Sequence, residues 1–379
     1  MFSFWEQQSF TNYHYAIIGG GLVGISTALS IKELHPASEV AVFERGIIPY
    51  GASTRNAGFA CFGSLSELLC DIDAIGLEKT RQLVMDRWSG LQLLRKRVGD
   101  TNLEYQNHGG YELLFEKDLW LLDKLDYVNE LLTPIFDKPV FTVNNQLIRR
   151  FGLNNTRVVS LIQNPFEGQL HAGAMMKSLI ALARERGINC LTGARVKSLH
   201  QEGDSVSLTA CAENADIKFK CRRAAVCTNA FANSLLPDLE IKPGRGTVLI
   251  TQPVKKLKFK GVFHYHQGYY YFRNLGSRVI FGGGRNLDFK GEETFDFGFN
   301  ERIVEHLKNE LGDLILPHQP FEIDQQWSGI MAFGQDKRPL VGLQSPAIGY
   351  AVRLGGMGVA LGSMVGHQLA KLICFYENC

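Results

Sequence analysis

The residues best suited to chemistry lie near the amino terminus, where three glycines stand at G-x-G-x-x-G spacing. They are Gly19, Gly21 and Gly24, in a segment that runs from residue 15 to residue 45. In this arrangement the first glycine permits a tight turn, the second lets the backbone approach a pyrophosphate, and the third lets a helix lie close to a sheet. Glu44 follows, and its carboxylate can accept hydrogen bonds from a ribose hydroxyl pair. The pattern predicts a dinucleotide site.

The segments around these glycines have the pattern of a β–α–β unit. Tyr15–Ile18 is short, apolar and partly β-branched, as expected for a buried parallel strand. Apolar residues at helical spacing from Leu22 to Leu29 predict a helix whose first amides face the phosphates. Val40–Phe43 predicts a second strand that ends at Glu44. Because all these parts agree, the dinucleotide interpretation outweighs that of an ordinary glycine-rich turn.

The composition is that of an ordinary globular chain. Its 379 residues suffice for two domains, and the formal net charge is +2 with 21% charged residues. The densest basic run, Lys255–Lys260, is interpreted as a solvated strand edge or loop, since a nucleic-acid site needs a longer basic stripe. We therefore expect no nucleic-acid partner.

Cysteine usage and apolar runs bear on the compartment. Eight cysteines occur without a C-x-x-C pair, and the first ten residues lack the basic and apolar regions of a secretion signal. No uninterrupted apolar run has membrane-spanning length, and the predicted helix after Gly358 carries His367 and Lys371, which favours packing in the core. We expect free thiols, no metal site, no transmembrane segment and a cytoplasmic location, and we leave the oligomeric state open.

Helical and strand patterns along the rest of the chain predict two interleaved domains. Between residues 246 and 284, alternation and turn residues predict antiparallel hairpins over a substrate cavity, and the loop at 51–64 interrupts the first domain. Helices are predicted at 77–98, 119–132, 172–185 and 301–311 and at the carboxyl end, and strands at 111–115, 196–199, 206–210, 217–221 and 224–228.

Four blocks of sequence resemble one known family. They are Ser3-Phe4-Trp5-Glu6, Gly51–Gly58 (GASTRNAG), Thr228-Asn229-Ala230, and a stretch from Trp327-Ser328-Gly329 through Asp336, Pro339 and Gly342 to Gly356–Leu361 (GMGVAL). In order and spacing they resemble the FAD-dependent amine and amino-acid oxidoreductases of the D-amino-acid oxidase superfamily. The branch with sarcosine oxidase, glycine oxidase and γ-glutamylputrescine oxidase is the most similar.

The resemblance implies an α/β fold in which a Rossmann-like FAD-binding domain carries an inserted α+β substrate domain built on an antiparallel sheet. The FAD-binding domain would comprise residues 1–90, 155–238 and 327–379, and the substrate domain residues 91–154 and 239–326.

The resemblance also implies which residues hold FAD. Ser53, Arg55 and Asn56 would offer donors to the pyrophosphate and the flavin edge, although a surface salt bridge is the alternative for Arg55. Val196 would hold the adenine through its backbone, or serve only in a strand core. The expected set is Gly19, Gly21, Leu22, Val23, Gly24, Glu44, Arg45, Ser53, Thr54, Arg55, Asn56, Gly58, Phe59, Val196, Thr228, Asn229, Gly356, Met357, Gly358 and Val359.

The reaction that the resemblance implies is oxidation of a C–N bond in a small amine or amino acid. Hydride would pass to flavin N5, and the imine product would hydrolyse. Met331 stands where glycine-oxidase-like members carry an arginine for the substrate carboxylate, and Ile280 stands near the place of the lysine linked to oxygen activation in sarcosine oxidase. The carboxylate and the electron acceptor therefore stay open. The alternatives are a flavin dehydrogenase of a 2-hydroxy acid, an FAD module acting on modified tRNA, and a purely structural FAD-binding protein.

Candidates for the substrate site come from the hairpins and the carboxyl-terminal region. Arg353 is the first candidate for an anionic substrate group, with a structural ion pair as its alternative. Arg273 and Arg285 are further cations in this region. The residues assigned to catalysis are Arg353, Tyr265, Tyr271 and Met331.

Other side chains of these segments allow two interpretations. Tyr265, Tyr269 and Tyr271 alternate, so they either line the cavity together or pack across strands. His264 and His266 are interpreted as sheet histidines, because a metal pair would need a third ligand. Cys61 lies close enough in sequence to Gly58 to reach the flavin, and a buried free thiol is the favoured interpretation.

Overall fold

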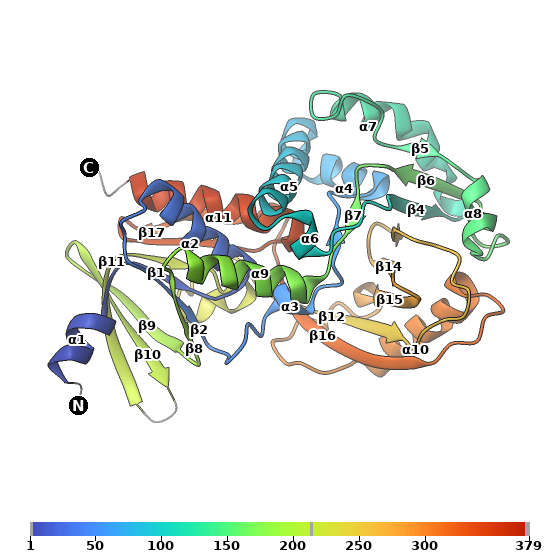
Figure 1. The fold of residues 1–379 in the computed structure, drawn as a ribbon. Coiled ribbons are helices and arrows are strands. Elements are labelled where there is room, and N and C mark those ends of the chain that lie inside the picture. The colour runs from blue at the N-terminus through green and yellow to red at the C-terminus, as the bar shows by residue number, and fades with distance from the viewer. Residues whose placement is uncertain (1–2, 213–214, 376–379) are drawn as a thin grey trace.

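Residues 3–212 and 215–375 are described by a computed structural model, in which the predicted β–α–β unit lies at the centre of a large sheet (Figure 1). Its first strand, β1 (Asn12–Ile18), pairs in parallel with β2 (Val40–Glu44) and with β11 (Ala215–Val226). Tyr15 and Ile17 pack against helices, and Ala16 and Ile18 pack against strands and a short helix on the other face. Because both faces are covered, the strand is a continuous apolar run.

Eight strands make up this first sheet. The path runs β17–β18–β11–β1–β2–β8, and β10 joins β11 and β9 in antiparallel pairs. The remaining bounds are β8 (Asn189–Thr192), β9 (Arg195–Glu202), β10 (Ser205–Ala212), β17 (Leu340–Ser345) and β18 (Ile348–Val352).

A layer of helices covers one face of the first sheet. It consists of α2 (Leu22–Leu34), α5 (Leu77–Val98), α9 (Ala172–Glu185) and α11 (Gly358–Phe375). The carboxyl-terminal helix α11 packs against both α2 and α5 (Figure 1). Of the described helices, α11 alone has the length and mean hydropathy needed to cross a membrane, and 61% of it is buried inside the protein.

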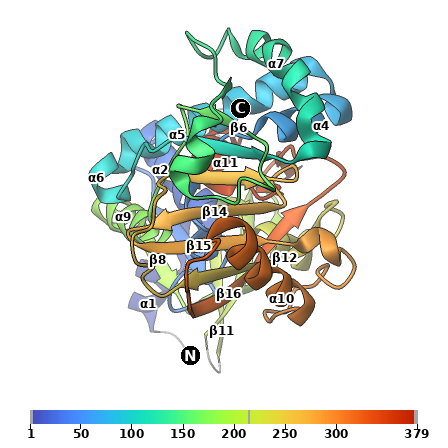
Figure 2. The ribbon, with the colours of Figure 1, turned by 90° about the vertical axis from the view of Figure 1, so that its right-hand side faces the viewer.

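The second sheet is mostly antiparallel and runs β16–β12–β15–β14–β13–β4–β6–β5. Figure 2 shows β14, β15, β12 and β16 side by side with α10 over them. Only the pairing of β13 with β4 is parallel among the described pairs of this sheet. The bounds are β4 (Gly110–Leu114), β5 (Thr142–Val143), β6 (Ser160–Asn164), β12 (Lys242–Thr251), β13 (Val262–Tyr265), β14 (Tyr270–Leu275), β15 (Arg278–Gly283) and β16 (Ile323–Phe333).

Shorter elements connect the two sheets or cover their outer faces. A small pair, β3 (Phe59–Ala60) with β7 (Gly168–Gln169), lies between them. The rest are α1 (Phe4–Phe10), α3 (Ala52–Arg55), α4 (Leu65–Ile75), α6 (Asp100–Leu103), η1 (Glu116–Lys124), α7 (Leu125–Leu132), α8 (Gln146–Phe151), η2 (Asn229–Ser234), η3 (Arg285–Leu287), α10 (Glu301–Glu310) and the π-helical turn η4 (Leu311–Ile315).

The architecture confirms the predicted fold class, a parallel Rossmann-like sheet with a separate, mostly antiparallel sheet. Two details of the predicted elements are wrong. The strands expected at 217–221 and 224–228 are one strand, β11, because its first half pairs with β10 while its second half continues beside β1. The run at 119–132 is a 3₁₀ segment followed by the shorter helix α7.

Strand pairing also bears on the expected domain limits. Ser160–Asn164 and most of β16 fall in segments that we assigned to the cofactor domain, yet both strands pair within the second sheet. Residues 1–2 and 376–379, which include Cys379, lie outside the described residues, as do residues 213–214.

Candidate active site

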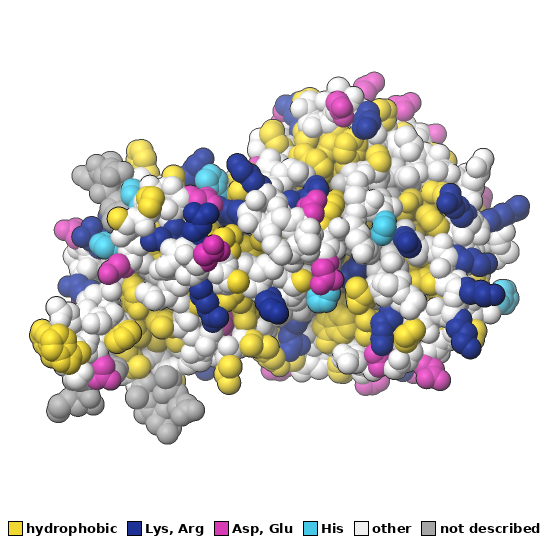
Figure 3. Space-filling model, viewed as in Figure 1, with side chains coloured by type: hydrophobic (Ala, Val, Ile, Leu, Met, Phe, Trp, Pro, Cys, Tyr) yellow, Lys and Arg dark blue, Asp and Glu magenta, His cyan; other side chains and the backbone are white. Residues whose placement is uncertain are grey.

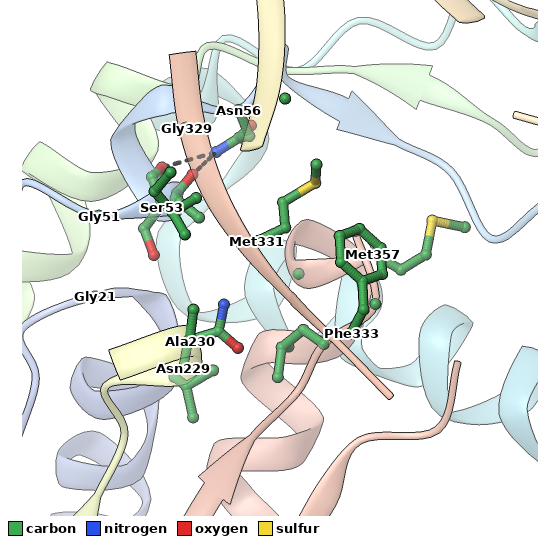
Figure 4. A pocket seen from close by; sticks show the side chains of 18 of the residues that line it. Gly21, Gly51, Ser53, Asn56, Asn229, Ala230, Gly329, Met331, Phe333 and Met357 are labelled. Carbon is green, nitrogen blue, oxygen red and sulfur yellow. Dashed lines mark hydrogen bonds between the residues drawn. The ribbon is translucent and has the colours of Figure 1, made fainter. Parts of the chain in front are cut away.

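A cavity of about 680 Å³ extends from the carboxyl ends of β1 and β2 to the inner face of the second sheet. Its walls come from segments that are far apart in sequence, and Figure 4 shows Ser53, Asn229, Met331 and Met357 converging on it. Parallel sheets place ligands at the carboxyl ends of their strands, so the position is the expected one for a nucleotide.

The amino-terminal glycine turn forms one end of this cavity. Gly19 has φ +109°, and a Cβ added at Gly24 would lie 1.8 Å from the carbonyl oxygen of Gly19, so both positions need glycine. The Gly20 N–H donates to Glu44 Oε2 at 3.0 Å, and the Gly46 N–H donates to Oε1 at 2.9 Å. These bonds hold the Glu44 carboxylate on the cavity wall.

The segment from residue 51 to 58 is shaped by its own side chains. Ser53 Oγ accepts from the Leu22 N–H at 2.9 Å, which leaves the hydroxyl proton for a ligand. Asn56 donates to the carbonyls of Ala52 and Ser53, as the dashed lines in Figure 4 show, and it accepts from the Gly58 N–H at 2.9 Å. The side-chain amide of Asn56 therefore stabilises its own loop. It does so with the donor and acceptor atoms that we expected to face a cofactor.

Arg55 is held above the same region by aromatic and backbone contacts. Its guanidinium lies 4.3 Å from the ring centre of Tyr50 and 4.4 Å from that of Phe297, and it donates to the Ser328 carbonyl at 2.7 Å. The Trp327 indole N–H in turn donates to the Arg55 carbonyl at 2.8 Å. These contacts replace the surface salt bridge that was the alternative for Arg55.

The carboxyl-terminal glycine turn approaches the cavity from the other side. Gly355 and Gly356 have φ +57° and +84°, and α11 begins at Gly358. A Cβ added at Gly356 would have only Met331 Sδ, at 3.8 Å, within contact distance. Thr228 Oγ1 is buried beside the cavity and has no partner among the described residues. Open space and an orphaned hydroxyl fit a bound group with acceptor atoms.

The far end of the cavity suits a flat ring. The guanidinium of Arg45 lies 4.0 Å from the ring centre of Phe231, and both residues line the cavity together with Val196. The amino ends of α2 and α11 both meet the cavity and favour negative charge there. The residues thus fit an elongated dinucleotide with an anionic middle.

Comparison with known proteins decides which dinucleotide this is. Residues 14–372 match the DAO family, described as FAD dependent oxidoreductase. The chain belongs to this family. Its membership confirms FAD as the cofactor and the resemblance from which FAD was predicted.

Relatives of this DAO-family chain are distant in sequence and similar in fold. The probable oxidoreductase OrdL of Haemophilus influenzae is 20% identical over 94% of this chain and 82% of its own length. L-proline dehydrogenase from P. horikoshii matches with a TM-score of 0.77 at 18% identity, over 96% of this chain and 93% of that chain. Glycine oxidase from Geobacillus kaustophilus matches with a TM-score of 0.73 at 18% identity, over 96% and 95%.

The cavity of this DAO-family chain brings together most of the expected site residues. Three of the expected residues do not line the cavity, namely Gly24, Thr54 and Gly58. They lie behind its wall, within the turns that shape it. Those that line it are Gly19, Gly21, Leu22, Val23, Glu44, Arg45, Ser53, Arg55, Asn56, Phe59, Val196, Thr228, Asn229, Tyr271, Met331, Gly356, Met357, Gly358 and Val359.

Arg353 does not line the cavity, which corrects its assignment to the substrate. Its side chain lies 3.4 Å from Asp336 Oδ1 and donates to the carbonyls of Arg338 and Glu240 at 3.3 and 3.5 Å. Its N–H donates to Asn229 Oδ1 at 3.0 Å, and its backbone has φ +63°. The guanidinium is used to fix the turn before the carboxyl-terminal glycines, so the structural alternative applies.

Tyr265 also lies away from the cavity, because the hairpin turn changes the expected alternation. It pairs with Tyr270 across β13 and β14, and its hydroxyl donates to Glu310 at 3.3 Å on the face covered by α10. Tyr271 pairs with His264 on the opposite face, toward the cavity. His266 falls in the turn itself, outside β13, so it does not share a strand face with His264.

The second-sheet end of the cavity carries most of the ionisable groups that sequence reasoning did not assign. Glu67 and Asp71 stand one turn apart on α4, and Lys337 Nζ lies 3.9 Å from Glu67 and 3.2 Å from Asp71. Arg87, which is fully buried, holds Asp71 from the other side at 3.3 Å. We did not predict α4, although Ser64 and Glu67 form a capping box whose S-x-x-E spacing is a sequence signal for a helix start.

Burial and partners set the protonation of this end. Burial alone would raise the pKa of Glu67, but Lys337 and His264 and the Ser64 N–H bring that pKa below its usual value. Burial raises the pKa of Glu112 to about 7 and that of Glu167 to about 8. Glu67 is therefore ionised at neutral pH, while the two deeper carboxyl groups titrate near neutrality.

Cys61 lines the cavity as a buried free thiol. Burial, followed by the charges of Glu167 and Glu67, raises the pKa of its thiol well above the usual value. A neutral thiol is a poor nucleophile.

Proposed function

We propose that this DAO-family enzyme oxidises the C–N bond of a small amino acid or amine. Bound FAD supplies the acceptor for the hydride that leaves the substrate carbon, and the imine product hydrolyses in water. The walls of the cavity bind and orient the substrate and exclude water from the reacting carbon. An amino acid is the substrate class that the charges at the second-sheet end favour.

The preference for an amino acid rests on the position and contacts of Arg285. It lines the cavity, and its guanidinium lies 3.9 Å from the ring centre of Phe333 and 4.9 Å from that of Phe289. Within the described part of the chain the Arg285 guanidinium makes no hydrogen bond or ion pair, whereas that of Arg55 donates to a backbone carbonyl. A guanidinium held by stacking alone keeps its fork of donors for a carboxylate.

The position of Arg285 also explains how the site can have Met331 where an arginine was expected. Met331 and Phe333 lie two residues apart on β16, so their side chains lie on the same face of the strand. Figure 4 shows both side chains at the cavity, close to Met357. The guanidinium on Phe333 is thus placed beside the site where glycine-oxidase-like members were expected to carry an arginine. In this chain η3, which follows β15, supplies the cation that β16 lacks.

The test is anaerobic reduction of the purified yellow protein by a panel of compounds. Glycine, sarcosine, L-proline and iminodiacetate represent amino acids, putrescine represents amines without a carboxylate, and L-lactate represents 2-hydroxy acids. We expect bleaching of the flavin by at least one amino acid. Bleaching by L-lactate alone would establish the 2-hydroxy-acid alternative in place of ours.

A variant of Arg285 tests the carboxylate contact. Because charge-assisted hydrogen bonds contribute about 1.5–3 kcal/mol, Arg285→Met should raise the half-saturating amino-acid concentration about 10- to 100-fold, and Arg285→Lys should raise it less. Arg302→Met removes the same charge from an exposed position on α10 and should change nothing. An unchanged half-saturating concentration in Arg285→Met would rule out the contact.

The surface does not favour a nucleic-acid substrate. On the face in Figure 3, Lys and Arg side chains are scattered among acidic and uncharged ones. Small molecules in the cavity are the better fit.

A further inference from the structure

His264 presents a buried ring nitrogen that has no hydrogen-bond partner among the described residues. It lies on β13 opposite Tyr271, its ring forms a T-shaped pair with that of Phe59 with the ring centres 5.2 Å apart, and 7% of its side chain is exposed. The unpaired atom is Nε2, and Glu167 Oε2 lies 3.8 Å from it. Orphaned buried polar atoms are rare and call for an explanation. Here the residue lines the same cavity as Arg285 and Met331.

Glu167 is fixed behind His264. It is 1% exposed, and its Oε1 accepts the N–H groups of Phe62 at 3.1 Å and Gly63 at 3.4 Å. A Cβ at Gly110 would lie 2.0 Å from Oε2, so the absence of a side chain there makes room for the carboxyl group. The backbone thus anchors one carboxyl oxygen and leaves the other for the histidine.

The neighbouring ionisable groups are poor proton acceptors. Glu67 faces the same space from α4, but its pKa is lowered and its Oε2 already accepts from the Ser64 N–H and hydroxyl. Burial raises the pKa of Tyr271 to about 12 and that of Cys61 well above its usual value, so both are protonated. Lys337 is paired with Asp71 and Glu67. His264 is the neutral base that remains on this wall.

We propose that His264, positioned by Glu167, accepts the proton that a substrate ammonium must lose before its carbon can be oxidised. This inference rests on the proposed function, since it concerns an amine. The N–H bond of the ammonium breaks and its electron pair stays on the substrate nitrogen, while the proton forms a new N–H bond at Nδ1, the ring nitrogen that does not face Glu167. The charge moves to an imidazolium that the Glu167 carboxylate stabilises, and the substrate nitrogen can then supply electrons as its carbon loses hydride.

The titration of the pair agrees with this role. Burial lowers the pKa of His264, against the opposing effect of Glu67, and burial raises the pKa of Glu167 to about 8. Above pH 8 the pair has therefore lost its own protons and can take one from a bound ammonium. Besides Glu67, Glu112 from β4 and Arg87 from α5 are the charged groups packed around this cluster.

The test compares His264→Gln with His266→Gln in the FAD-loaded protein. The rate of anaerobic flavin reduction is measured from pH 6 to pH 10 with glycine, sarcosine and L-proline. Without its acceptor, His264→Gln depends on amine that is already neutral in solution, so at pH 8 it should be about 100-fold slower than the wild type. The loss should shrink toward pH 10, where the free amine is abundant. His266→Gln, whose ring lies against Phe115 outside the cavity, should keep the wild-type profile.

A second readout does not depend on turnover. Nuclear magnetic resonance of histidine-labelled holoenzyme gives the pKa of His264, assigned by the signal that His264→Gln lacks. Glu167→Gln should lower that pKa, because the imidazolium loses its carboxylate, and it should slow reduction at pH 8 in the same direction as His264→Gln. An unchanged His264 titration in Glu167→Gln would overturn the positioning role.

The outcomes separate this proposal from the proposed function. If the wild type is bleached and His264→Gln keeps its pH profile, the histidine is not the acceptor and the function stands. If no amine bleaches the wild type, both proposals fail together. A loss at pH 8 that recovers at high pH, with FAD absorbance retained, supports both.

Discussion

Replacement of Gly90 by alanine should destabilise the protein even though alanine is the better helix former. Gly90 lies inside α5, and a Cβ added there would lie 2.0 Å from the carbonyl oxygen of Ala360 in α11. An ordinary contact begins at 3.4 Å, so the helices would have to separate by about 1.4 Å. The carbonyl oxygen is a backbone atom and the Cβ is bonded directly to the backbone, so no side-chain rotation relieves the overlap.

The carboxyl-terminal helix cannot retreat, because α2 holds it from another side. A Cβ at Gly366 of α11 would already lie 2.8 Å from the carbonyl oxygen of Val23, so the α11–α2 contact is close as well. The gain in helix propensity is about 1 kcal/mol. Overpacking of this kind costs about 3 kcal/mol, so the net loss of stability is about 2 kcal/mol. For a chain of 379 residues that lowers the melting temperature by about 2–3 °C.

Thermal unfolding of the FAD-free protein, followed by circular dichroism, measures this loss. Because Ala360 also lines the cavity, we further expect about tenfold weaker FAD binding in a fluorescence titration. Ser89→Ala, the adjacent change on α5, is the control and should leave both quantities near wild type. If Gly90→Ala melts at or above the wild-type temperature and binds FAD normally, the contact between α5 and α11 is not tight and the reasoning is wrong.

Three further predictions concern individual side chains. Arg353→Ala should lower the free energy of unfolding by about 2 kcal/mol through loss of the Asp336 pair, with an unchanged half-saturating substrate concentration in steady-state kinetics. Acid precipitation should release all flavin into the supernatant, since the Cys61 thiol is neutral, and yellow colour in the pellet would contradict this. The pKa of Glu112 is raised to about 7 in the folded state, so wild-type stability falls as the pH rises to that value. Glu112→Gln removes this loss and should be more stable than wild type by up to about 3 kcal/mol at pH 8, with little difference at about pH 4, below the ordinary pKa of the carboxyl, in urea titrations.

Local patterns were sufficient for the cofactor half of the molecule. The turn at Gly19–Gly24 and the acid at Glu44 depend on steric and hydrogen-bonding rules that act within one β–α–β unit, and the folded chain places them on the cavity wall. The helices at 77–98 and 172–185 have the predicted bounds, because their apolar spacing runs without interruption from cap to cap. Such features depend on neighbours in sequence.

The substrate end could not be predicted in the same way. Tyr265 faces α10 because the turn before Tyr270 sets the strand register, and a shift of one residue exchanges the two faces of a strand. The Arg353 guanidinium is paired with Asp336. The Arg285 guanidinium stacks on Phe333, which lies in a different strand, and stays free to bind a ligand.

The amino-acid order by itself determined the β–α–β unit and the glycine turn of a dinucleotide site, because short-range sterics and periodicity specify them, and its resemblance to a known family implied FAD and the fold class. Only the tertiary structure decided which charges face the cavity. Glu167 and His264 come from segments about a hundred residues apart, and their pKa values depend on the burial that packing of the second sheet creates. Desolvation is a property of the assembled interior, so no local pattern can report it.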